Sequence, residues 1–193
     1  MTAPEPAAYN AIYPACVKTG RAVLFAGVRE MLETYEIDRE AMLAYAEKWA
    51  FGVNPDFYDF SELGGDCTNF VSQCIYAGGA VMNYTPDLGW YYISLSDRAA
   101  AWTGVEFFAA FMLGNKSAGP FGVQVPLSDV EPGDVVQLGT DDGFYHSLLV
   151  TGKGGTGGPL VTAHTFDVYN RPLSEYSYRY IRCIHIIGAR RWV

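Results

Sequence analysis

A cysteine at position 67 follows Gly64-Gly65-Asp66 and opens a run with helical periodicity. Apolar residues recur there at offsets 0, 3, 4, 7 and 8, one face of an α-helix: Cys67, Phe70, Val71, Cys74 and Ile75. A thiol in the first turn of a helix lies beside unpaired N–H groups and the positive end of the dipole, which both stabilise a thiolate. The same N–H groups could bind the oxyanion of a tetrahedral intermediate. Cys67 is therefore a candidate nucleophile, although a lone cysteine can equally begin a buried apolar stripe.

The sequence holds three histidines, His146, His164 and His185. The first begins one predicted strand, and the second ends the next one. If Val150 lies opposite Leu160, antiparallel pairing places His146 opposite His164, with Cβ atoms about 4.5–5.5 Å apart. A slip of one residue would separate the two rings. The third histidine lies in the last predicted strand and is expected to be a satisfied core residue.

Together these residues predict a division of roles. Cys67 attacks a carbonyl carbon, His146 accepts the thiol proton and later protonates the leaving amine, and His164 fixes the tautomer of His146. Asp167 and Asn170 follow closely in the sequence and are alternatives for the third position.

The elements that must position these residues follow from periodicity and turn residues. Helices are expected over 21–34, over 39–50 with Asp38 as N-cap, from Asp66 to the Gly78-Gly79 stop, and over 99–113. Strands are expected over 135–138, 145–151, 160–165 and 181–187, the middle two joined by a glycine-rich hairpin loop. Helices followed by antiparallel strands predict an α+β fold.

The size and charge of the chain limit its class. With 193 residues, half of them apolar, it suits one domain over 20–193 after an irregular lead-in over 1–19. A net charge of -8 argues against nucleic acid as the main partner, and no apolar run is long enough for a membrane span. No signal peptide is recognised, so the chain as written is expected in the cytoplasm, or outside the cell or in its envelope if an export signal precedes it.

Several other patterns are set aside. The four cysteines match neither a zinc-ligand pair nor a disulfide framework, and Cys74 and Cys183 are expected to be buried. Gly152, Gly154 and Gly157 satisfy a dinucleotide-binding pattern, but they lie between strands and are read as a loop that can move over the cleft. No cofactor is expected. Four aromatic residues could line a groove, although core packing is the better expectation: Trp90, Tyr91, Tyr92 and Trp102.

The run from Gly65 to Cys74, continued by Tyr76-Ala77-Gly78-Gly79, resembles the putative amidase domain of bacterial proteins. That family is similar to the papain-like group that contains the NlpC/P60 and CHAP cell-wall peptidases. The resemblance covers roughly 37–187 and includes Pro132-Gly133-Asp134, Tyr145-His146-Ser147 and Ala163-His164-Thr165.

The resemblance implies a papain-like fold in which the nucleophile helix packs on an antiparallel sheet. It also implies Cys67 and His146 as the catalytic pair and His164 as the third polar residue. The chain departs from NlpC/P60 proteins at Thr68-Asn69, where those have Ser-Gly, and Tyr58 is only an approximate counterpart of their upstream tyrosine.

The leading hypothesis is therefore a thiol hydrolase that cleaves an amide bond in a bacterial peptide or peptidoglycan fragment through a thioester. An acyl-transferring relative would use the same thioester. The alternatives are a metal site built from Cys67, His146 and His164, and a binding module that has lost activity. The oligomeric state is left open.

Overall fold

The structure is a computed structural model that describes residues 30–193. Its helices are α1 (Arg39–Trp49), α2 (Cys67–Ala77), α3 (Ala100–Thr103) and α4 (Val105–Gly114), with 3-10 turns at Leu127–Asp129 and Leu173–Glu175. Its strands are β1 (Leu32–Tyr35), β2 (Tyr92–Ser94), β3 (Asp97–Arg98), β4 (Gly119–Val125), β5 (Val135–Thr140), β6 (Gly143–Gly152), β7 (Leu160–Ala163), β8 (Val168–Pro172) and β9 (Tyr180–Trp192).

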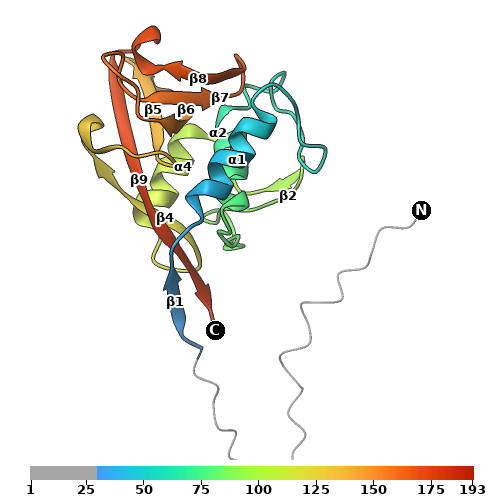
Figure 1. The fold of residues 1–193 in the computed structure, drawn as a ribbon. Coiled ribbons are helices and arrows are strands. Elements are labelled where there is room, and N and C mark those ends of the chain that lie inside the picture. Colours follow the sequence, from blue (N-terminus) through green and yellow to red (C-terminus); the bar gives the residue numbers. More distant parts are fainter. Residues whose placement is uncertain (1–29) are drawn as a thin grey trace, which may run out of the picture.

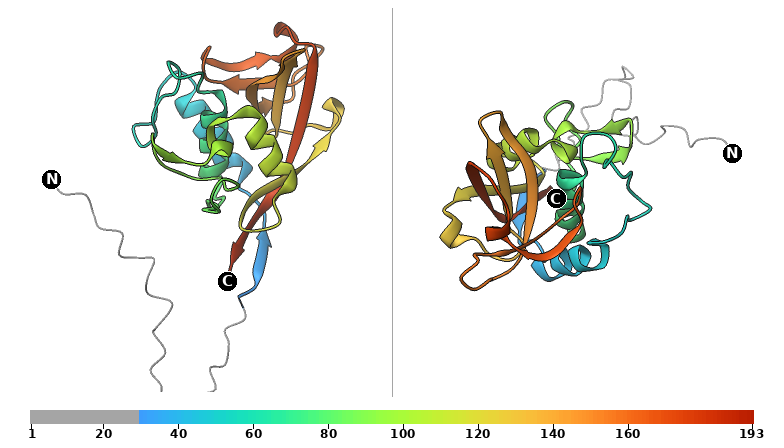
Figure 2. Two further views of the ribbon diagram at one scale, coloured as in Figure 1. Left: turned by 180° about the vertical axis from the view of Figure 1, so that it is seen from behind. Right: turned by 90° about the horizontal axis from the view of Figure 1, so that it is seen from above.

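One antiparallel sheet organises the described residues. Its strand order is β1-β9-β5-β6-β7-β8, with β4 pairing with β9 beside this path, while β2 and β3 form a separate ribbon. The helices lie against one face of the sheet, and the paired ends of β1 and β9 project from the body (Figure 1, Figure 2). The predicted α+β class is confirmed. No described helix is long and apolar enough to cross a membrane.

Two apolar cores lie on the two faces of the sheet. The core between helices and sheet combines residues of α2 with inward residues of the strands, among them Phe70, Cys74 and Leu149. The core on the other face includes Leu138, Leu148, Val150 and Cys183. Because successive strand residues point to opposite faces, alternate residues of β6 divide between the two cores.

The predicted helices agree with the structure where their signals are local. Asp38 caps α1 by accepting the N–H of Ala41 at 2.9 Å, and α2 begins at Cys67 as predicted. The helix predicted over 99–113 is interrupted at Gly104, where extended backbone separates α3 from α4. The helix predicted over 21–34 is wrong at its end, because 32–34 belong to strand β1. Residues 30 and 31 are not helical either, and the part over 21–29, like the lead-in over 1–19, lies outside the described residues.

The hairpin of β6 and β7 was predicted with the wrong register. Val150 pairs with Val161 and Leu149 with Thr162, so Leu160 is not opposite Val150. A bulge between Val150 and Gly152 shifts the register at this point. If the pairing is continued toward the start of β6, Ser147 and not His146 is the partner of His164. The two histidines therefore do not share a face of this hairpin.

Candidate active site

The start of α2 presents a cysteine and a set of free backbone donors. Cys67 is the first helical residue and is 5% exposed. Helical hydrogen bonding begins with the N–H of Phe70, which donates to the carbonyl of Asp66 at 2.9 Å. Within the described residues, the N–H groups of Cys67, Thr68 and Asn69 have no acceptor. Free N–H groups beside a nucleophile are the kind of donor that can bind a tetrahedral oxyanion.

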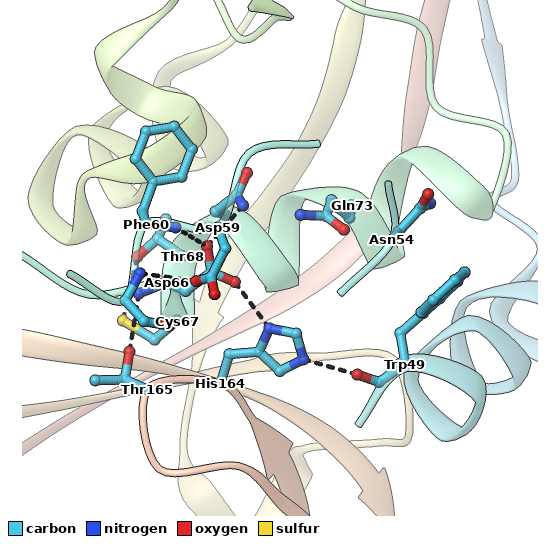
Figure 3. A network of polar contacts seen from close by, with 12 residues as sticks. Trp49, Asn54, Asp59, Phe60, Asp66, Cys67, Thr68, Gln73, His164 and Thr165 are labelled. Carbon is cyan, nitrogen blue, oxygen red and sulfur yellow. Dashed lines mark hydrogen bonds and ion pairs between the residues drawn. The ribbon is translucent and has the colours of Figure 1, made fainter. Parts of the chain in front are cut away.

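Asp66 does not cap α2 with its side chain, as the sequence had suggested. One carboxylate oxygen instead accepts the N–H of Phe60 at 2.9 Å and the side-chain amide of Asn69 at 2.8 Å. The other lies 2.8 Å from Nδ1 of His164 (Figure 3). Asp66 therefore ties the loop before the helix, the helix itself and the sheet to one another.

His164 forms a buried ion pair and not the expected contact with His146. Its Nε2 lies 2.8 Å from the carbonyl oxygen of Trp49, which can only accept, and its Nδ1 faces Asp66 (Figure 3). The ring stacks on Phe70 with centroids 4.0 Å apart. Burial lowers the pKa of His164, but the bonds to Asp66 and to the Trp49 carbonyl outweigh burial and raise it above the usual value. Both nitrogens therefore face acceptors, an arrangement that favours the imidazolium, and His164 fastens α1, α2 and the end of β7 together.

The turn after His164 is also fastened to the start of α2. Thr165 accepts the N–H of Asp66 through Oγ1 at 2.9 Å, and its φ of 86° is unusual for a residue with a β-branched side chain (Figure 3). Gly65 faces this hydroxyl with a φ of 112°, and a Cβ at that position would lie 3.2 Å from Thr165 Oγ1. The turn over 164–167 and the glycine turn before the helix therefore fit closely against each other.

The Cys67 sulfur lies in a buried polar setting. It is 3.8 Å from the Thr68 hydroxyl, whose Oγ1 is in turn 2.9 Å from Oγ of Ser147 on β6. Burial raises the pKa of the Cys67 thiol, while the backbone amide of Ser147 and the Thr68 groups lower it by less. The thiolate expected from the helix dipole alone is therefore not the resting form here, because loss of solvent outweighs the nearby donors.

His146 stands next to the strand position that contacts Cys67. It pairs with Leu138 across β5 and β6, which places it on the face opposite Ser147, and a bulge follows Phe144 at this point. Its ring lies 6.1 Å from that of Tyr176. Within the described residues the imidazole ring makes no hydrogen bond, and burial lowers the pKa of His146 to about 4. The predicted base His146 is thus neutral. It is adjacent in sequence to Ser147, which contacts Cys67, but it does not bond to the sulfur.

The remaining predicted residues take structural positions. Neither Asp167 nor Asn170 bonds to His146 within the described chain, so these alternatives for the third position gain no support. His185 is satisfied as expected, with Nδ1 2.9 Å from Asp134, although its side chain is partly exposed. Cys74 and Cys183 are buried in the two cores, as predicted.

The aromatic residues and the glycine-rich loop do not form part of the site. Trp90 and Trp102 are fully buried, with their indole N–H groups bonded to Ser72 and Asn69, which confirms the core interpretation for these two. Tyr91 and Tyr92 are partly exposed. The loop over 153–159 follows the far end of β6, six residues or roughly 20 Å along the strand from His146. The expectation that it moves over the cleft is therefore wrong, since the hairpin places the loop at the opposite end of the sheet.

Two polar residues of the site were missed by the sequence analysis. Ser147 and Gln137 are fully buried on facing strands, and their side chains bond to each other at 3.1 Å. A glutamine inside the apolar run 135–138 was the available signal, because a buried amide requires polar partners. As for metals, no three His, Cys, Asp or Glu side chains within 30–193 converge as a ligand set.

Comparison with known proteins places the chain in a family. The family model described as a putative amidase domain matches residues 36–187. The chain therefore belongs to the putative amidase domain family, as the resemblance had indicated.

A relative in Bacillus subtilis (strain 168), the uncharacterized protein YhbB, is 36% identical over 137 residues. The match covers 69% of this chain and 43% of YhbB, so the chain spans less than half the length of that relative. No solved structure matches the chain. The papain-like description consequently stays a prediction beyond the α+β class.

Proposed function

We propose that this domain hydrolyses an amide bond through a thioester on Cys67. The observation on which this depends is the position of the thiol in the first turn of α2, beside three unbonded N–H groups and against the His146–Ser147 segment of β6. Membership of an amidase family supports the same reaction class. A structural cysteine would not need free donors beside it.

The proposed reaction has two steps. The sulfur of Cys67 attacks the substrate carbonyl carbon as His146 removes the thiol proton, and the N–H groups at the helix start bind the resulting oxyanion. His146 then returns that proton to the leaving amine, which leaves a thioester. Water hydrolyses the thioester, giving the carboxylate and regenerating the thiol.

The imidazole of His146 must turn toward the sulfur for this reaction. Catalytic hydrogen bonds in free enzymes are often unformed and tighten only when substrate binds. The bulge beside His146 is a place where strands commonly redirect side chains. His146 is neutral in its buried position, which is the protonation state that a base requires.

His164 receives a different role from the one the sequence suggested. Both of its nitrogens are engaged by Asp66 and the Trp49 carbonyl, so it can act only by holding the residue that precedes Cys67. We therefore assign it as a positioning residue. The substrate class that fits the family resemblance is a peptide or peptidoglycan fragment.

The test is amine release from a panel of muropeptides and simple peptides. Cys67→Ser should lower turnover of any cleaved member by at least about a thousandfold, because a hydroxyl is much harder to deprotonate than a thiol and is a weaker nucleophile in the same site. The matched control Cys183→Ser changes a buried thiol in the second core and should retain turnover. Quenched wild-type reactions should carry an acyl mass on the peptide that contains Cys67. Retained turnover in Cys67→Ser would refute the proposal.

A further inference from the structure

A row of buried polar side chains leads from the surface to the Cys67 sulfur. Nε of Arg182 donates to Oε1 of Gln137 at 2.8 Å, and Nε2 of Gln137 donates to Oγ of Ser147 at 3.1 Å. Ser147 lies 2.9 Å from Thr68, whose hydroxyl is 3.8 Å from the sulfur. Four residues on β9, β5, β6 and α2 thus form one continuous set of contacts.

The charge at one end fixes the orientation of the Gln137 amide. Arg182 can only donate, so the amide oxygen of Gln137 faces it and the amide nitrogen faces inward. That nitrogen donates to the carbonyl of Val105 at 2.9 Å and to Ser147. Since Ser147 accepts this bond, its own proton is free for Thr68, and the Thr68 proton is then free for the sulfur.

The outer end of the row is itself held in place. Nη2 of Arg182 bonds to Glu106 at 3.0 Å, and the guanidinium carbon lies 4.0 Å from the centre of the Phe144 ring. The Arg182 side chain is only 14% exposed. A guanidinium held by a carboxylate, a ring and an amide has little freedom to reverse the orientation of Gln137.

We propose that Arg182, Gln137, Ser147 and Thr68 form a directed hydrogen-bond chain whose last member donates a hydrogen bond to Cys67 Sγ and stabilises its thiolate. Arg182, Gln137 and the Ser147 side chain are positioning groups, because they act on the sulfur only through the Thr68 hydroxyl. The inference rests on the proposed function, since it explains how a buried thiol reaches its nucleophilic form. Chains of hydrogen bonds polarise one another in surroundings of low dielectric constant, so a distant charge strengthens the final bond.

The charged and titratable groups around this thiol must stay unchanged in any test. Asp66 acts on the thiol directly and is paired with His164, Arg182 and Glu106 hold the outer end of the chain, and His146 is next to Ser147 on β6. Replacing Thr68 by valine alters none of them. The variant removes one hydroxyl and keeps the shape of the side chain.

The measurement is the rate at which iodoacetamide alkylates Cys67, followed across pH by mass spectrometry of the peptide that contains it. Thr68→Val should raise the midpoint of this profile by about one pH unit, which slows alkylation near neutral pH about tenfold, as expected for loss of a hydrogen bond to a charged group. Thr68→Ser should restore the wild-type midpoint. Gln137→Met, which cuts the chain two residues away, should raise the midpoint by less.

The matched control is Thr162→Val. Thr162 is a buried threonine whose hydroxyl also pairs with another hydroxyl, Oγ1 of Thr151 at 3.0 Å. Its replacement by valine should leave the alkylation midpoint of Cys67 unchanged. An unchanged midpoint in Thr68→Val, or no recovery in Thr68→Ser, overturns the proposal. If Thr68→Val does not fold, an unchanged midpoint in Gln137→Met overturns it instead.

No substrate enters this assay, so the result is independent of turnover. A shifted midpoint together with retained turnover in Cys67→Ser would preserve the hydrogen-bond chain and refute the hydrolase. An unchanged midpoint in Thr68→Val together with lost turnover in Cys67→Ser would refute the hydrogen-bond chain and support the hydrolase.

Discussion

The carboxylate of Asp66 is deeply buried, and its partner is His164, with Nδ1 2.8 Å away and a pKa that this pairing raises. Removal of one member of a buried ion pair leaves the other charged and without a partner. The sequence placed both residues near the nucleophile but could not pair them, because 98 positions separate them in the chain. Such long-range partners are decided by the packing of the sheet on α2 and not by local patterns.

We expect His164→Ala to lower the free energy of unfolding by about 3 kcal/mol or more, the usual cost of breaking a buried pair. His185→Ala is the matched control. His185 also pairs with a buried aspartate, but Asp134 keeps Arg39 at 2.9 Å after the change, so the loss should be clearly smaller. Urea unfolding at neutral pH measures both. Equal losses of unfolding free energy in the two variants would show that the His164–Asp66 pair contributes no more to stability than the His185–Asp134 pair.

Local elements were predicted where the signal was local. The apolar spacing from Cys67 to Ile75 and the Asp38 cap gave α2 and α1 correctly, because helix faces and caps are encoded within a few residues. The hairpin of β6 and β7 was found, but its register was not, because the bulge after Val150 has no distinct residue signature. One displaced residue changed which residue of β6 lies opposite His164, and the predicted triad depended on that pairing.

The glycine turn before α2 provides a prediction for an element. Gly65→Ala should lower the free energy of unfolding by roughly 1–2 kcal/mol, because a φ of 112° is strained for alanine and its Cβ would lie 3.2 Å from Thr165 Oγ1. Gly155→Ala is the control, since that glycine has ordinary φ and open space around it. Urea midpoints of the two variants should differ clearly. A Gly65→Ala protein as stable as wild type would show that the turn is not constrained.

At the scale of the whole molecule, two histidines make stability depend on pH in opposite ways. The pKa of His146 is lowered to about 4 in the folded state, so the unfolded chain binds its proton first as pH falls below about 6.5. This costs stability between those two values, up to roughly 3 kcal/mol. The pKa of His164 is raised, so its contribution is complete below about 6.5 and is lost as pH rises through the higher folded value.

The stability of the wild-type protein should therefore have a maximum near pH 6.5 that these two groups help to shape. His146→Gln should reduce the loss of unfolding free energy below pH 6.5, and His164→Gln should reduce the loss above pH 6.5. Urea unfolding free energies of the three proteins between pH 4 and 9 provide the measurement. If the loss of stability at acidic pH is unchanged in His146→Gln, His146 is not its cause.

Strand β9 pairs with β1, β4 and β5, and its last residues lie beside Leu32–Tyr35 near the beginning of the described region. The chain is synthesised from its N-terminus, so β1, β4 and β5 are made before β9, the strand with which all three pair. During synthesis the helices have no completed sheet to cover, and their apolar faces are open to chaperones and to aggregation until residues 180–192 emerge.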